Sequence, residues 1–129
     1  MSKKILIADD EPNIVAALEF LLQRNGYEVH VARNGDEALK VVEAWKPDLV
    51  LLDIMMPQRS GYDVCRCLRE SAEWRHIKVV MLSAKGRDAE VSKGLAIGAD
   101  LYVTKPFSTR DLLGKINALL GGAPDAGHT

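Results

Sequence analysis

Five side chains that could carry out phosphoryl or metal chemistry each follow a short apolar run in this sequence. They are Asp9, Asp10, Asp53, Ser83 and Lys105. The run before Asp53, Leu49-Val50-Leu51-Leu52, has no polar face, which is typical of a strand buried on both sides. In open α/β sheets, ligands bind outside the carboxyl ends of the strands, so these side chains would meet at one edge.

Each residue type suits one part of phosphoryl transfer. Three carboxylates in one crevice repel one another and favour a hard divalent cation, Mg²⁺ above all. A lysine and a hydroxyl that face the carboxylates suit phosphoryl oxygens, which need a cation and hydrogen-bond donors. An aspartate can itself act as the nucleophile and form an acyl phosphate. Each residue alone could be a helix cap or a surface charge, but chance convergence of all five is much rarer.

The elements that would position these residues alternate along the chain. Strands are predicted to start near residues 4, 28, 49, 78 and 101, each followed by a helical pattern of apolar residues. The first helix would open at Glu11-Pro12 and the fourth would cover about residues 88–97. This alternation predicts a parallel sheet with right-handed crossovers and helices on both faces. Periodicity leaves the strand order open, although the flavodoxin-like order is common at this length.

Composition indicates one globular domain. The 129 residues are 47% hydrophobic and 27% charged, enough for a buried core. A net charge of −1 offers no basic excess for nucleic acid or an anionic membrane. Because we find no signal peptide and no long apolar run, we expect a cytoplasmic protein. We expect the domain at residues 1–120 and a flexible tail at residues 121–129.

The cysteines and histidines do not suggest a second site. Cys65 and Cys67 have one residue between them, and a helix would point them in different directions, so free thiols are expected rather than a zinc site. Cys67 is expected on the inward face of its helix with Val64 and Leu68. The histidines are scattered along the sequence: His30, His76 and His128.

Together, the motifs resemble the receiver domain of bacterial two-component response regulators, and the chain is similar to the chemotaxis response regulator over about residues 3–120. The resemblance rests on Asp9-Asp10, on Asp53-Ile54-Met55-Met56-Pro57 with Gly61 beyond, on Ser83-Ala84 and on Lys105-Pro106-Phe107. It implies a flavodoxin-like, doubly wound five-stranded parallel sheet of order 2-1-3-4-5 with five helices, (βα)5.

The resemblance also implies how the acidic residues act. Asp53 would accept a phosphoryl group from a phosphohistidine. Asp10, Asp53 and the backbone carbonyl of Met55 would bind Mg²⁺ directly, with Mn²⁺ as a possible substitute, and Asp9 would act through water. The protein would then be no general enzyme, because it would catalyse only its own phosphorylation and dephosphorylation.

Four further positions have implied roles in the switch. Ser83 and Lys105 would contact the phosphoryl oxygens, Tyr102 would change rotamer, and the bond before Pro106 would be cis. The implied partners are a sensor histidine kinase or a phosphotransfer protein, and an output partner or domain at the face formed by the fourth helix, the fifth strand and the fifth helix. A homodimer on phosphorylation is a further option, with no direct binding to nucleic acid or to a membrane.

Two other classes of protein share parts of this pattern. A stand-alone phosphatase with an aspartyl nucleophile usually carries a second acid two residues later, where this sequence has Met55. A flavin-binding electron carrier of similar fold would need a phosphate loop after the first strand, and no Gly-rich loop follows it here.

Overall fold

Strands and helices alternate in the computed structural model, which describes residues 3–56, 60–83 and 98–121. The elements in chain order are β1 (Lys4–Ala8), α1 (Pro12–Arg24), β2 (Glu28–Ala32), α2 (Gly35–Trp45), β3 (Leu49–Asp53), α3 (Gly61–Glu70), β4 (Lys78–Ser83), β5 (Leu101–Thr104) and α5 (Thr109–Leu119). All five predicted strands are present, and four helices lie within the described residues. The fourth predicted helix, at about residues 88–97, falls outside them.

The strands form one parallel sheet of order β2-β1-β3-β4-β5, which confirms the flavodoxin-like order. From β1 the chain goes outward to β2 and then returns to β3 on the other side of β1. This reversal is the topological switch point of a doubly wound sheet, where ligands bind beyond the strand ends. The register pairs Ala8 with Leu52, so Asp9 and Asp53 flank that point.

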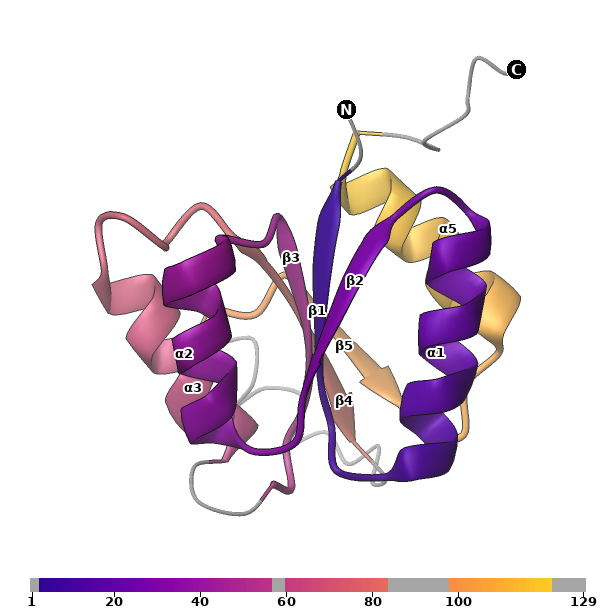
Figure 1. Cartoon of the computed structure of the whole chain (residues 1–129), viewed down its shortest axis with the longest axis horizontal. Coiled ribbons are helices and arrows are strands. Elements are labelled where there is room, and N and C mark those ends of the chain that lie inside the picture. Colours follow the sequence, from indigo (N-terminus) through magenta and orange to yellow (C-terminus); the bar gives the residue numbers. More distant parts are fainter. Residues whose placement is uncertain (1–2, 57–59, 84–97, 122–129) are drawn as a thin grey trace.

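Helices cover both faces of the sheet (Figure 1). One face carries α1 and α5, and the other carries α2 and α3. Side chains of β1 alternate between the two faces, because successive residues of a strand point in opposite directions. Ile5 and Ile7 lie in the core beneath α1 and α5, whereas Leu6 and Ala8 lie in the core beneath α2 and α3. Two apolar layers therefore hold β1 in place, and the predicted acidic residues Asp9 and Asp10 follow its carboxyl end.

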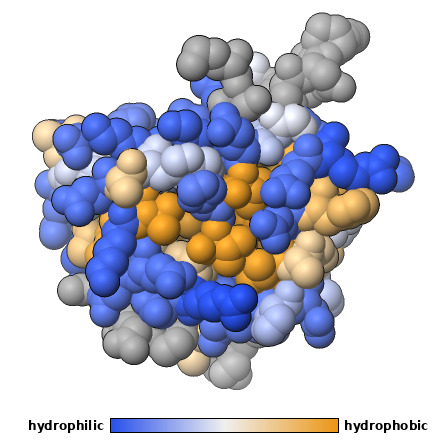
Figure 2. Space-filling model, in the orientation of Figure 1, coloured by the Kyte–Doolittle hydropathy of each residue, from blue (hydrophilic) through white to orange (hydrophobic). Residues whose placement is uncertain are grey.

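One edge of the sheet is formed by β2, where apolar surface remains visible between hydrophilic residues (Figure 2). Val29 and Val31 of β2 are only half-buried. On the other face of β2, the His30 ring stacks on Trp45 with ring centroids 3.9 Å apart. Trp45 thus serves to pack the end of α2.

Across the described residues, none of the helices has the length and apolarity needed to cross a membrane.

Polar side chains begin three of the four described helices. Asn34, Ser60 and Ser108 accept hydrogen bonds from the backbone N–H groups of Glu37, Asp63 and Asp111. Such caps satisfy N–H groups that have no partner within the helix. Helix α1 differs, because its N-cap residue Glu11 makes no side-chain cap bond within the described part of the chain.

The start of α3 packs tightly against the end of β3. The Gly61 N–H donates to the Ile54 carbonyl at 3.0 Å, and a Cβ at Gly61 would lie 2.5 Å from the backbone oxygen of Asp53. Only glycine allows this approach, because the nearby atoms belong to the backbone. The absence of a side chain at Gly61 therefore helps to fix the strand end that carries Asp53.

We expect Gly61→Ala to lower the free energy of unfolding by about 2 kcal/mol, the usual cost of overpacking. Gly114→Ala is the matched control, since a Cβ at Gly114 in the middle of α5 would meet nothing within 4 Å. That change should instead stabilise the protein by about 1 kcal/mol through helix propensity. Urea unfolding of the three proteins measures both effects, and a Gly61→Ala variant as stable as the parent would refute the close contact.

Candidate functional site

Three carboxylates converge at the carboxyl edge of the sheet. Asp9 and Asp10 follow β1, and Asp53 ends β3. Each offers one oxygen, and these three oxygens lie within 4.8 Å of one another. Asp9 is fully buried and Asp53 is 4% exposed, whereas Asp10 is exposed to solvent. A set of oxygen donors that is open on one side fits a hard divalent cation such as Mg²⁺, which keeps several waters when it binds.

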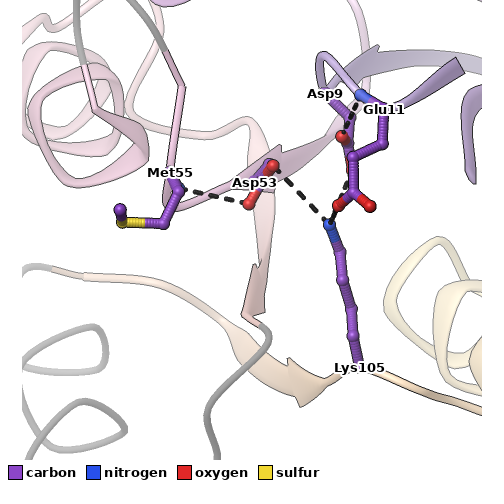
Figure 3. Close-up of polar contacts among 5 residues, drawn as sticks. All are labelled: Asp9, Glu11, Asp53, Met55 and Lys105. Carbon is purple, nitrogen blue, oxygen red and sulfur yellow. Dashed lines mark hydrogen bonds and ion pairs between the residues drawn. The ribbon is translucent and has the colours of Figure 1, made fainter.

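Lys105 reaches this cluster from the end of β5 (Figure 3). Its Nζ lies 2.5 Å from Glu11 Oε1, 3.1 Å from Asp9 Oδ2 and 3.6 Å from Asp53 Oδ2. The backbone N–H of Lys105 donates to the Ser83 carbonyl at 2.5 Å, which ties the lysine to the end of β4. A single ammonium group therefore faces three carboxylates.

The electrostatics of the cluster disfavour the charged form of Asp53 when metal is absent. Burial raises the pKa of the Asp53 carboxyl from 3.8 to about 6, and the Asp9 carboxylate adds to the increase. Lys105 and a 3.2 Å hydrogen bond from the Met55 N–H to Asp53 Oδ1 oppose it. The site thus holds more negative charge than one lysine neutralises, and a bound cation would relieve the excess.

The ammonium of Lys105 stays charged in this setting. Burial alone would lower its pKa, but the hydrogen bond to Glu11 and the charges of Asp53 and Asp9 outweigh burial and raise it. Lys105 is therefore a permanent cation at neutral pH. Its chemistry is charge stabilisation and not proton transfer.

The remaining predicted residues lie around the cluster. Ser83 is 3% exposed and ends β4 opposite Thr104. Tyr102 is half-buried in β5, next to Met81 in the register. The Lys105–Pro106 peptide bond is cis. Met55 is 76% exposed, and its thioether cannot protonate a leaving group as the second acid of an aspartyl phosphatase does.

Sequence reasoning did not identify Glu11 as a site residue. The acid directly before Pro12 matches a helix start, because acids favour the positive end of a helix. The structure directs its carboxylate to Lys105, 94 residues away in the sequence. The only available signal was its position next to Asp9-Asp10.

Comparison with known proteins agrees with this geometry. The family model of the response regulator receiver domain matches residues 5–117. The chain therefore belongs to the response regulator receiver domain family. Its function is accordingly that of a receiver in two-component signalling, which sets aside both the phosphatase and the flavin carrier.

Individual relatives support the same assignment. The chain is 45% identical over 120 residues to the alkaline phosphatase synthesis transcriptional regulatory protein PhoP of Bacillus subtilis, covering 93% of this chain and 49% of PhoP. A putative response regulator from Chloroflexus aurantiacus superposes with a TM-score of 0.90 at 30% identity, covering 94% of this chain and 99% of that one. The BeF3-activated N-terminal receiver domain of Klebsiella pneumoniae RstA gives 0.85 at 33% identity, covering 92% and 98%. The chain spans about half the length of PhoP.

Proposed function

We propose that Asp53 accepts a phosphoryl group from the phosphohistidine of a sensor histidine kinase or phosphotransfer protein, in a Mg²⁺-dependent reaction. The observation that carries this proposal is the placement of Asp53. Its carboxylate is almost fully buried, lies beside Asp9 and Asp10, and has the Lys105 ammonium 3.6 Å from Oδ2. Such a site combines a nucleophile with charge stabilisation for a phosphoryl group.

In the proposed reaction, an ionised Asp53 oxygen forms a bond to phosphorus while the bond from phosphorus to the histidine nitrogen breaks. The electron pair of the broken bond stays on the imidazole, which takes a proton from solvent. Asp9, Asp10, Asp53 and the Met55 carbonyl would hold Mg²⁺, which supplies positive charge to the transferring oxygens. Lys105 supplies a second positive charge, and the Ser83 hydroxyl supplies a hydrogen bond.

The acyl phosphate would act as a switch. Ser83 and Lys105 would turn toward the new oxygens, and Tyr102 would follow into the space that opens beside Ser83. An output partner or domain would read the change at the face that includes β5 and α5, either directly or through homodimerisation. We place the receiver at residues 1–120 and expect the protein to work in the cytoplasm. The tail predicted at residues 121–129 lies, apart from Gly121, outside the described residues.

The wild-type protein should gain one acid-labile phosphoryl group when it is incubated with acetyl phosphate and Mg²⁺. Intact-protein mass spectrometry measures the gain. Chelation of the metal with EDTA should prevent it, because the carboxylates would then repel the anionic donor. Equal labelling with and without EDTA would contradict the role of the metal, and no labelling in Mg²⁺ from either acetyl phosphate or a histidine kinase would contradict the proposed function.

A further inference from the structure

The closest partner of Lys105 lies at the rim of the acidic cluster and not inside it. Nζ is 2.5 Å from Glu11 Oε1 but 3.6 Å from Asp53 Oδ2, which is beyond hydrogen-bond distance. Figure 3 shows the lysine extended toward Asp9 and Glu11, with Asp53 to one side of its ammonium. In the unphosphorylated protein, the Lys105 ammonium therefore binds Glu11 and Asp9 more closely than it binds Asp53, the proposed site of the phosphoryl group.

Side-chain capping of α1 does not explain Glu11. N-cap positions favour Ser, Thr, Asp and Asn, whose side chains bond the first N–H groups of the helix. The Glu11 side chain makes no such bond within the described residues. Its backbone N–H donates to Asp9 Oδ1 at 2.9 Å, so the main chain is held without the carboxylate. The Glu11 carboxylate is therefore available to bind Lys105.

We propose that Glu11 is a positioning residue that holds Lys105 away from Asp53 in the unphosphorylated protein and competes with the phosphoryl group for its ammonium. This inference rests on the function proposed above. An ammonium has three N–H donors, and the two close carboxylates, of Asp9 and Glu11, occupy two of them. To bind Lys105, a phosphoryl group on Asp53 must compete with these two contacts.

The solvent exposure of the two carboxylates determines which of them Lys105 releases when it binds a phosphoryl group. The Glu11 side chain is 55% exposed, whereas that of Asp9 is fully buried. Water and salt screen an exposed ion pair and leave it weak, whereas a buried carboxylate without its partner is costly. The phosphoryl group therefore displaces Glu11 and keeps Asp9. The strength of the contact with Glu11 therefore determines how readily Lys105 becomes available to the phosphoryl group.

Glu11→Gln should therefore bind a phosphoryl mimic more tightly than the wild type. The probe is beryllium fluoride with Mg²⁺, titrated by calorimetry. We expect the dissociation constant to fall about threefold, the size expected from one exposed ion pair, and the difference to shrink in about 0.5 M salt. Glu43→Gln is the matched control: it removes the same charge from an exposed position on α2 and should bind as the wild type does.

Glu11→Asp separates the contact from the charge. Aspartate keeps the charge but is shorter by one methylene, so it would no longer reach Lys105 and should bind the mimic like Glu11→Gln. The inference is overturned if Glu11→Gln binds equally well or more weakly than the wild type, or if Glu11→Asp binds as the wild type does, which would indicate a field effect without contact. If the wild type neither binds the mimic nor becomes phosphorylated, the proposed function fails instead.

Discussion

Asp53→Asn is expected to stabilise the metal-free protein at pH 7, raising its free energy of unfolding by about 3 kcal/mol. The reason is the raised pKa of Asp53, which burial and the Asp9 carboxylate move from 3.8 to about 6. At pH 7 the folded wild type must therefore carry a buried charge that is disfavoured there. An amide of the same shape carries no charge and can still accept the hydrogen bond that the Met55 N–H donates to Oδ1.

The sign of the effect fixes its pH dependence. A carboxyl whose pKa is raised on folding binds its proton more tightly in the folded state, so its contribution to stability is highest below the unfolded pKa of 3.8. The contribution is lost as the pH rises through about 6. The stability difference between Asp53→Asn and the wild type should therefore be near zero at about pH 4 and reach its full size above pH 6.

Urea unfolding in EDTA at several pH values measures this difference. Asp10→Asn is the control, because Asp10 is exposed and the carboxylate that raises the pKa of Asp53 is that of Asp9. The control should differ little from the wild type at any pH. Equal stability of Asp53→Asn and the wild type at pH 7 would show that Asp53 carries no buried, unfavourable charge.

Local patterns were sufficient to predict the strands and where they end. The apolar run before Asp53 is typical of a buried strand, and a parallel sheet brings all strand ends to one edge, so the acidic cluster followed. The order of the strands came from the resemblance, because periodicity within a strand carries no information about its neighbours.

Predictions that depended on long-range contacts or on helix phase were less successful. Cys67 was expected on the inward face of α3, but Cys65 is the fully buried cysteine and Cys67 is only half-buried. The inward positions are Gly61, Val64, Cys65 and Leu68, a helical spacing that includes the closely packed Gly61. Glu11 was missed because its partner, Lys105, is distant in the sequence.

Asp53→Asn is also expected to abolish phosphorylation by acetyl phosphate or by a histidine kinase. A neutral amide is a poor nucleophile. Asp9, the other buried carboxylate beside Lys105, is fully buried, and both of its oxygens already accept hydrogen bonds, from the Glu11 N–H and from the Lys105 ammonium. Asp63→Asn makes the same change at the start of α3 and should leave labelling as in the wild type. Because Asp53→Asn is expected to be more stable than the wild type, unfolding would not explain a loss of labelling.

The phosphorylated residue itself can be identified in the wild-type protein. Borohydride reduces an aspartyl phosphate to homoserine, and peptide mass spectrometry then locates the reduced residue. We expect the modification at Asp53 and nowhere else. Modification at Asp9, Asp10 or any other residue, with Asp53 unchanged, would contradict Asp53 as the phosphoryl acceptor.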